Sequence, residues 1–501
     1  MSDEEARREY GTAQRLGLLG GGLLFLVLLA LPAPEGMSIE AWRTAIVAIL
    51  MAIWWMTEAI PIPATAMLPL VLFPVLGVLS MPSAAEPYAN ELIFLFMGGF
   101  FLAVSMQRWE LHRRIALGIL GAVGTQPGSL VFGFMLATAF LSMWISNTAT
   151  AAMMLPIALA VSERFRPKDV PAVDPDGPPH PFNFGTALML GLAYAANIGG
   201  LSTLIGTPPN AVLAGAADEM LGIRIGFLEW MMVGVPISAF MLPVTWLLLV
   251  RVLYPPGTLE GDAGAVIASE RQALGRMSRG ERVVAVVFVL TALSWVFREP
   301  KDMGFVRIPG LADLSPLIRD STIAMAAAVL LFLLPINLRK GQFALDWEHA
   351  RRIPWGVLLL FGGGLSLARA MDDSGLAAWI GGGVVGLAGV PTWVLILAVA
   401  ALFVFLTEMT SNTATSTMAM PIMAGAAVGV GSPPLVLMAT AALGASMAFM
   451  LPVATPPNAI VFGSGFITIP QMAKAGLWLN IISITVITVA ATFLVVGVLV
   501  R

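Results

Sequence analysis

A five-residue string occurs twice in this chain and constrains its fold more than any other feature. Ser-Asn-Thr-Ala-Thr stands at 146–150 and again at 411–415, each time inside an apolar run. A Thr-Pro-Pro-Asn follows each copy, at 207–210 and at 455–458. Small polar residues and helix-breaking prolines are costly at membrane depth unless they line a cavity. Their duplication therefore indicates a cavity with two symmetric halves near the middle of a bilayer.

The composition places the whole chain in a membrane. Of its 501 residues, 58% are hydrophobic and 11% are charged, whereas a soluble domain carries roughly a quarter charged residues. There is no cysteine, which excludes disulfides, thiolate metal sites and cysteine nucleophiles. We expect a polytopic protein in a lipid bilayer, with no nucleic acid partner and no organic cofactor.

Apolar runs of about 17–25 residues predict membrane-spanning helices. We expect an all-α fold with eleven of them, at 16–33, 42–60, 64–80, 90–107, 183–217, 228–251, 282–298, 320–337, 353–370, 433–465 and 473–500. Two further runs, 128–162 and 390–430, are too long for one span and carry the Ser-Asn-Thr copies near their middles. We predict that each is a re-entrant hairpin, a helix–tip–helix with both ends on one side of the membrane.

Positive charge supports the hairpins and sets the orientation. With the N-terminus cytoplasmic, most of the 27 Lys and Arg residues fall in cytoplasmic segments, as the positive-inside rule requires. If either hairpin crossed the membrane, every later loop would change sides and the bias would weaken. We therefore expect the first hairpin to open inward, the second to open outward, and the C-terminus to lie outside.

The two halves of the chain are in register. The Ser-Asn-Thr copies stand 265 residues apart, and the same spacing relates Gly99 to Gly364 and Pro156 to Pro421. The Thr-Pro-Pro-Asn copies stand 248 apart because the first half carries a longer polar loop at 163–182. We predict a first span in 1–41, repeats at 42–251 and 282–501, and a cytoplasmic connector at 252–281. An odd number of spans per half makes this an inverted repeat.

The tips have the chemistry of an anion site. A helix begins just after each Ser-Asn-Thr, so its free N–H groups and positive dipole end point at the tip. Neither tip carries Lys or Arg nearby. The side chains are neutral: the amides and hydroxyls of Asn147, Thr148, Asn412 and Thr413 can bond carboxylate oxygens, and Ser142, Ser146, Thr407 and Ser411 offer hydroxyl oxygens.

The Thr-Pro-Pro-Asn breaks have the chemistry of cation sites. Two prolines remove backbone donors and stop a helix, so the carbonyls of the preceding turn lose their partners. Free carbonyls at a broken helix are ligands for a hard monovalent cation. Gly206 and Ala454, just before the breaks, leave room for an ion. Two tips and two breaks thus predict two cation sites beside one anion site. Glu408, next to the second tip, is either a further cation or proton site or a group that bonds backbone and shapes the hairpin.

At these residues the chain resembles the divalent anion/sodium symporter family, the INDY-type di- and tricarboxylate carriers. The resemblance runs from about residue 42 to the end, and 449–465 is similar to the second signature of the family. It implies a homodimer with a scaffold domain and a mobile transport domain that moves like an elevator. It also implies sodium sites at Ser142, Ser146, Asn147 and the Gly206 backbone, and at Thr407, Thr410, Asn412 and the Ala454 backbone. It implies substrate contacts at Asn147, Thr148, Thr207, Pro208, Ser411, Asn412, Thr413, Thr455 and Pro456.

We therefore predict a sodium-coupled symporter of C4 dicarboxylates such as succinate, malate and fumarate, co-transporting two or more Na⁺ in a bacterial inner (plasma) membrane. A sodium-independent dicarboxylate exchanger and a sulfate or tricarboxylate carrier of the same family are the alternatives. An intramembrane enzyme is disfavoured, because no His lies near Ser146 or Ser411 and no cluster of metal ligands is visible.

Overall fold

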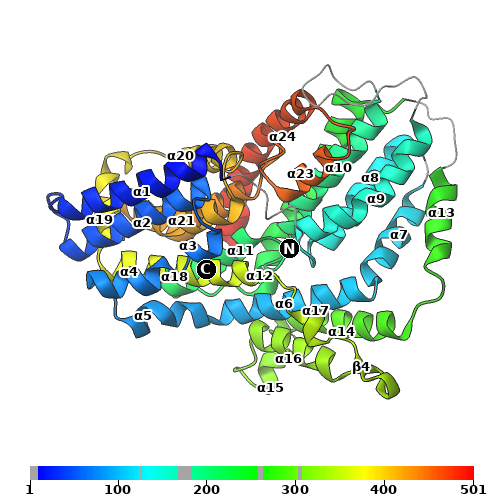
Figure 1. The fold of residues 1–501 in the computed structure, drawn as a ribbon, viewed down its shortest axis with the longest axis horizontal. Helices are drawn as coiled ribbons and strands as arrows, with labels where there is room; N and C mark the ends of the chain where they lie inside the picture. The colour runs from blue at the N-terminus through cyan, green and yellow to red at the C-terminus, as the bar shows by residue number, and fades with distance from the viewer. Residues whose placement is uncertain (1–9, 125, 167–181, 258–262, 303–306, 501) are drawn as a thin grey trace.

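The computed structural model describes residues 10–124, 126–166, 182–257, 263–302 and 307–500. Most of them are helical (Figure 1). The helices of the first half are α1 (Thr12–Ala30), α2 (Ile39–Thr57), α3 (Ile62–Thr65), α4 (Leu68–Leu76), α5 (Met81–Ala85), η2 (Glu86–Ala89), α6 (Glu91–Arg108), α7 (Leu111–Val123), α8 (Pro127–Ser142), α9 (Asn147–Phe165), α10 (Asn183–Gly200), α11 (Pro208–Leu221), α12 (Phe227–Leu247) and η3 (Leu248–Leu253).

The second half repeats this order of elements. After α13 (Ala263–Ala273) come α14 (Arg279–Val296), α15 (Leu311–Leu314), α16 (Asp320–Leu333), η4 (Leu338–Lys340), α17 (Trp347–Ala350), α18 (Trp355–Asp373), α19 (Leu376–Gly383), η5 (Val385–Leu387), α20 (Thr392–Leu406), α21 (Asn412–Val430), α22 (Pro434–Ala445), α23 (Pro456–Phe462), α24 (Ile469–Ala490), η6 (Ala491–Val495) and α25 (Val496–Leu499). The succession α8–α9–α10–α11 corresponds to α20–α21–α22–α23.

The prediction of an all-α fold agrees with the mostly helical structure, although short strands also occur among the described residues. Two antiparallel strand pairs occur, β1 (Lys301–Asp302) with β2 (Arg307–Ile308) and β3 (Pro335–Asn337) with β4 (Gln342–Phe343). Both lie in connections between apolar helices, and each strand has only two or three residues. Runs this short have no period-2 pattern that sequence reading could detect.

Every predicted span contains a helix, but the number of spans stays a prediction. Among the described residues, six helices are long and apolar enough to cross a membrane: Thr12–Ala30, Ile39–Thr57, Met81–Arg108, Phe227–Leu253, Asn412–Val430 and Ile469–Leu499. Five apolar helices are shorter. The side of the membrane to which each hairpin opens, and the repeat boundaries, also stay predictions. Most of the polar loop 163–182 lies outside the described residues.

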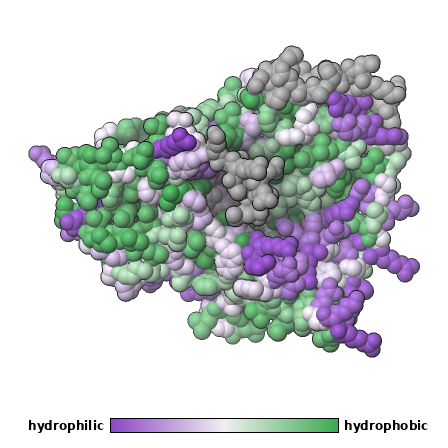
Figure 2. Space-filling model, viewed as in Figure 1, coloured by the Kyte–Doolittle hydropathy of each residue, from purple (hydrophilic) through white to green (hydrophobic). Residues whose placement is uncertain are grey.

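The surface suits a lipid environment. The α1 helix exposes Leu16, Leu19 and Leu23, each by more than half. Apolar residues cover the left-hand part of the face in Figure 2, where Figure 1 places α1, α2 and α19, and hydrophilic residues gather toward the right-hand side. An apolar surface of this breadth is unusual for a soluble monomer and expected for a protein embedded in lipid.

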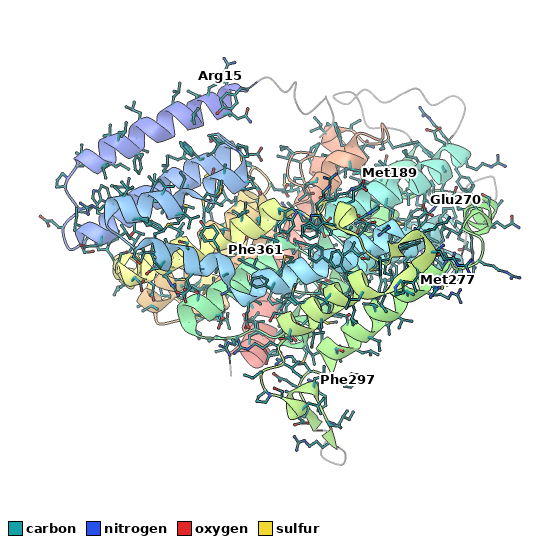
Figure 3. All side chains as sticks on the ribbon, turned by 60° about the horizontal axis from the view of Figure 1, so that its bottom comes forward. Arg15, Met189, Glu270, Met277, Phe297 and Phe361 are labelled. Atoms are coloured by element: carbon teal, nitrogen blue, oxygen red, sulfur yellow. The ribbon has the colours of Figure 1, made fainter. Side chains whose placement is uncertain are left out.

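Small residues let the helices of the first hairpin pack closely on α10. A Cβ added to Gly199 would overlap the carbonyl of Ala139 on α8, so these two backbones nearly touch. Both α8 and α9 pack against α10, and α20 and α21 both pack against α22. Phe361 of α18, near the centre of Figure 3, packs edge-on against Phe96 of α6 with ring centroids 5.1 Å apart. The hairpins are thus held inside a packed bundle.

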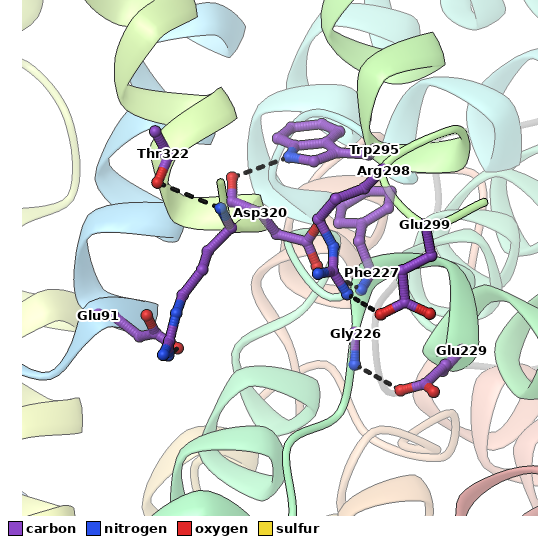
Figure 4. A network of polar contacts seen from close by, with 10 residues as sticks. Glu91, Gly226, Phe227, Glu229, Trp295, Arg298, Glu299, Asp320 and Thr322 are labelled. Atoms are coloured by element: carbon purple, nitrogen blue, oxygen red, sulfur yellow. Dashed lines mark hydrogen bonds and ion pairs between the residues drawn. The ribbon is translucent and has the colours of Figure 1, made fainter. Parts of the chain in front are cut away.

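A partly buried polar network joins α12 to α14 and α16 (Figure 4). Asp320 accepts a hydrogen bond from the Phe227 backbone N–H at 2.8 Å and pairs with the Arg298 guanidinium at 2.9 Å. The Trp295 indole N–H donates to the Asp320 carbonyl at 3.0 Å. Because Asp320 caps the start of α12 while it begins α16, this network fixes α12 beside the rest of the bundle.

Candidate functional site

The first Ser-Asn-Thr lies at a helix break, as predicted. Helix α8 ends at Ser142 and α9 begins at Asn147. Ser146 is the N-cap of α9, and its Oγ accepts a hydrogen bond from the Ala149 N–H at 3.3 Å. Serine is favoured here because its side chain satisfies one of the free N–H groups of the first turn. Ser146 and Thr148 are exposed, so the start of α9 is accessible.

The second copy lies at an equivalent break. Helix α20 ends at Leu406, Ser411 is the extended N-cap residue, and α21 begins at Asn412. Ser411, Asn412 and Thr413 are half-buried. Unlike Ser146, Ser411 makes no side-chain cap bond. Each tip therefore presents the N-terminus of a 19-residue helix.

The Thr-Pro-Pro-Asn motifs interrupt the two central helices. Helix α10 stops at Gly200 and α11 starts at Pro208; α22 stops at Ala445 and α23 starts at Pro456. Prolines occupy the first two positions of α11 and α23, where the missing N–H costs least. Pro456 is exposed and Pro208 is half-buried, while Thr207 and Thr455 are buried.

The asparagine that ends each motif folds the break into a compact loop. The Asn210 amide donates to the carbonyls of Gly200 at 3.1 Å and Thr203 at 2.7 Å. The Asn458 amide donates to Ala448 at 3.3 Å and Leu451 at 3.1 Å. The acceptors stand ten and seven residues before the asparagine in both halves. This equivalence supports the repeat, and it gives the motif asparagines a structural role that the sequence did not reveal.

Each tip contacts the end of the helix before the break through one hydroxyl. Ser142 Oγ lies 2.6 Å from Asn147 Oδ1 and 2.7 Å from the Ala196 carbonyl. In the second half, Thr407 Oγ1 lies 2.6 Å from Asn412 Oδ1 and 2.8 Å from the Ala445 carbonyl. A hydroxyl has one proton, so it can donate to one of these two oxygens at a time.

The amide of Asn147 can face the Ser142 hydroxyl with its nitrogen or with its oxygen. With its nitrogen toward Ser142, it donates to Ser142 Oγ at 2.6 Å, to the Ala196 carbonyl at 3.1 Å and to the Gly206 carbonyl at 3.3 Å. With its oxygen there, four oxygens converge with too few protons to pair them. Neutral oxygens gathered in this way are ligands for a hard cation. These oxygens are the ligands that the predicted cation site would use, and the site itself stays a prediction.

Two other predicted cation ligands make hydrogen bonds of their own. Thr410 Oγ1 donates to the Leu406 carbonyl at 2.9 Å and lies 2.6 Å from Thr415 Oγ1, and Ser146 Oγ caps α9. The structure thus brings together Ser142, Asn147 and Gly206 at one break, and Thr407 with Asn412 at the other. The role of the Ala454 carbonyl stays a prediction.

Glu408 binds backbone and shapes the second break. Its carboxylate accepts hydrogen bonds from the N–H groups of Phe449 at 2.7 Å, Met450 at 3.0 Å and Leu451 at 3.3 Å. The Asn480 amide donates to it at 2.8 Å. Because donors surround this carboxylate, the shaping role is the better of the two predictions.

A different bond ties the tip to the break in the first half. There Met143 replaces the glutamate, and its carbonyl accepts the hydroxyl of Thr203 at 2.5 Å. Met143 and Thr203 stand at the positions equivalent to Glu408 and Leu451. The two halves therefore connect tip and loop at equivalent positions through different hydrogen bonds. In the first half a hydroxyl donates to a backbone carbonyl, and in the second half backbone N–H groups donate to the Glu408 side chain.

The two halves meet at the breaks. Helix α11 packs against α21 and α22, and α23 packs against α9 and α10. The Asn197 amide of α10 donates to the Ala448 carbonyl at 3.1 Å and to Thr455 Oγ1 at 3.2 Å. The repeated strings of both halves thus lie in one region. Asn197 was missed in the sequence, where its only signal is a lone amide in an apolar run.

Comparison with known proteins agrees with this geometry. Residues 16–499 match the model of the sodium:sulfate symporter transmembrane region. The chain belongs to the sodium:sulfate symporter family. Members of this family are membrane transporters, so the chain is a transporter and not an enzyme.

Two curated relatives in this family are similar along their whole length. The sodium-dependent dicarboxylate transporter SdcS of Staphylococcus saprophyticus is 43% identical over 504 residues, which cover 100% of this chain and 95% of the relative. The SdcS protein of Staphylococcus aureus strain MRSA252 is 41% identical over 496 residues, covering 99% and 94%. At 41–43% identity, the resemblance to the symporter family is confirmed.

A solved structure shares the fold. The crystal structure of the Alcanivorax borkumensis YdaH transporter, described as having an unusual topology, superposes with a TM-score of 0.53. The match covers 97% of each chain at 14% sequence identity. At this identity it supports only the fold of the chain.

Proposed function

We propose that this protein is a sodium-coupled symporter of C4 dicarboxylates in a bacterial inner membrane. The observation that carries the proposal is the pair of helix-start tips, each with an asparagine amide and a hydroxyl against a backbone carbonyl. Neither tip has Lys or Arg nearby in the sequence. The names of the SdcS relatives, sodium-dependent dicarboxylate transporters, support the same substrate and ion.

Magnitudes explain why such a site needs sodium. Taking a carboxylate out of water costs several kcal/mol per ion, and a helix N-terminus returns about 0.3–1 kcal/mol, or about 2 kcal/mol in a partly buried site. Two helix ends therefore fall short for a dianion. A cation about 4–5 Å away contributes about 3–4 kcal/mol at an effective dielectric constant of 20. Two captured Na⁺ ions offset most of the remaining cost.

The asparagine amides couple the ion to the acid. When the Asn147 oxygen turns toward Ser142, Ala196 and Gly206 to bind Na⁺, its nitrogen turns to the opposite side. An N–H group then faces the tip, where it can bond a carboxylate. Asn412 acts in the same way beside Thr407. Sodium therefore binds first, and the dianion docks between tips that sodium has ordered.

The other contacts and the movement are what the resemblance to the symporter family implies. The residues that contact the substrate besides the two asparagines are Thr148, Thr207, Pro208, Ser411, Thr413, Thr455 and Pro456. The ion sites are completed by Ser146, Thr410 and the Ala454 backbone. The hairpins and broken helices move together as an elevator against a scaffold, and the scaffold forms a homodimer. The N-terminus is cytoplasmic and the C-terminus is outside.

The test is uptake of labelled succinate by proteoliposomes. We expect uptake to require an inward sodium gradient and no preloaded counter-substrate, and to be competed by malate and fumarate. Uptake that is unchanged when potassium replaces sodium would refute the coupling. Uptake only into vesicles preloaded with dicarboxylate would indicate the exchanger. Because the family model is named for sulfate, sulfate and citrate are included as competitors.

Two variants test the tips in the same assay. Asn147→Ala and Asn412→Ala should each abolish uptake, because each removes an ion ligand and a carboxylate donor together. Size-exclusion chromatography should show the elution volume of the wild type. Near-normal transport by either variant contradicts the placement of the site at the tips.

A further inference from the structure

Asn197 is a buried amide that sequence reading left without a role. It lies in α10, one turn before the break at Gly200, and is 1% exposed. A buried amide in an apolar environment is costly unless its hydrogen bonds are made. Its nitrogen faces the Ala448 carbonyl at 3.1 Å. Because a carbonyl can only accept, this contact fixes which side of the amide is the nitrogen.

The second N–H of Asn197 determines the state of the Thr455 hydroxyl. It donates to Thr455 Oγ1 at 3.2 Å, and the Asn458 backbone N–H donates to the same oxygen at 3.4 Å. A hydroxyl has two acceptor positions and one proton. With both acceptor positions filled, the proton must point away from Asn197 and Asn458. The hydroxyl of Thr455 is thereby set as a donor.

This proton is the donor that the start of α23 has to offer. Pro456 and Pro457 have no N–H, the Asn458 N–H is bound by Thr455 Oγ1, and the Ala459 N–H donates to the Thr455 carbonyl at 3.1 Å. Each position of the first turn is therefore without an N–H or already bonded. Within the first turn of α23, the donor for a carboxylate is therefore the Thr455 side chain.

The first half lacks this device. The position equivalent to Asn197, 248 residues further on, is Ala445. Thr207, the counterpart of Thr455, makes no side-chain cap bond at the start of α11. No cap bond of α11 therefore orients its hydroxyl. The two breaks thus carry the same motif, but the Thr455 hydroxyl accepts two hydrogen bonds and Thr207 makes no cap bond.

We propose that Asn197 is a positioning residue that orients the Thr455 hydroxyl toward a carboxylate of the substrate. The proposal rests on the proposed function, and it adds an asymmetry: one carboxylate meets the preset donor of Thr455, and the other meets the adjustable hydroxyl of Thr207. Asn197 does not touch the substrate. It acts through Thr455, so its loss raises KM for succinate and leaves the maximal rate near that of the wild type.

A double-mutant cycle tests this in proteoliposomes, with KM and maximal rate for succinate measured at saturating sodium. Thr455→Val should raise KM about ten- to a hundredfold, as expected for the loss of a hydrogen bond to a charged group. Thr455→Ser, which keeps the hydroxyl, should stay near the wild type. Asn197→Ala should raise KM severalfold alone and add nothing in the Thr455→Val background.

Two results would overturn the proposal. One is an equal rise in KM from Asn197→Ala in both backgrounds, which indicates a purely structural amide. The other result is that Thr207→Val raises KM as much as Thr455→Val does. This comparison needs no change at Asn197, so it can be made even if the Asn197 variants fail to fold. If wild-type vesicles show no sodium-dependent succinate uptake, the proposed function fails instead, before any variant is compared.

Discussion

Replacing Asn147 by Asp should separate ion binding from substrate binding. The amide stands 2.6 Å from Ser142 Oγ, 3.1 Å from the Ala196 carbonyl and 3.3 Å from the Gly206 carbonyl. Aspartate keeps an oxygen toward this cluster, so the cation ligand remains and gains charge. On the opposite side an oxygen replaces the N–H group, so the donor to the carboxylate is lost.

The size of the effect follows from two terms. A lost hydrogen bond to a charged group costs about 1.5–3 kcal/mol. A new negative charge about 5 Å from the carboxylate costs about 3 kcal/mol at an effective dielectric constant of 20. Together they amount to about 5 kcal/mol, or roughly a thousandfold or more in affinity for succinate. Sodium affinity should be kept or increased.

Thermal unfolding in detergent reports the binding of sodium and of succinate, because a ligand that binds only the folded state raises the melting temperature by mass action. For Asn147→Asp we expect stabilisation by sodium without further stabilisation by succinate. Asn412→Asp should behave alike. Asn337→Asp, at the end of β3 and at the N-cap of η4, where Asp is as good as Asn, should match the wild type. Loss of sodium stabilisation with succinate binding intact would refute the reasoning.

Three further outcomes can be checked by thermal unfolding. Glu408→Gln should destabilise the protein by about 1–3 kcal/mol, because an NH₂ then faces backbone donors; an unchanged melting temperature would contradict this. Gly199→Ala should destabilise by about 1–3 kcal/mol or more through overlap with α8, while Gly118→Ala, with open space around it on α7, should not. Burial raises the pKa of Asp346, but hydrogen bonds from His349 outweigh this effect and hold the pKa below its ordinary value. Asp346→Ala should therefore destabilise the protein at neutral pH, and the difference from the wild type should disappear as the pH falls through the lowered pKa. A difference that persists at low pH would contradict this sign.

Local patterns carried most of what could be predicted. The helix starts at Asn147 and Asn412 and the breaks at the two proline pairs follow from rules that act over a few residues, N-capping and the loss of a backbone donor. The Ser-Asn-Thr copies are also in register, so their equivalence was readable without coordinates. The strand pairs β1–β2 and β3–β4 were not, because so few residues leave no period.

Long-range partners were outside the reach of any pattern. Asn197 acts on Thr455, 258 residues away, and no local rule links an amide in one helix to a hydroxyl in another half of the chain. Glu408 is similar. Its position beside the tip was visible, but two roles stayed open until the N–H groups of 449–451 were found around its carboxylate.

By itself, the sequence determined that this protein lies in a membrane, that its centre is built twice, and that each copy ends one helix and starts another with neutral side chains. Those properties depend on transfer free energy and on backbone chemistry, which each short segment carries with it. The tertiary structure alone decided which oxygens converge on Asn147, what holds Glu408, and where the Thr455 proton points. These depend on which distant groups meet, and hydrogen bonds act only over about 3 Å.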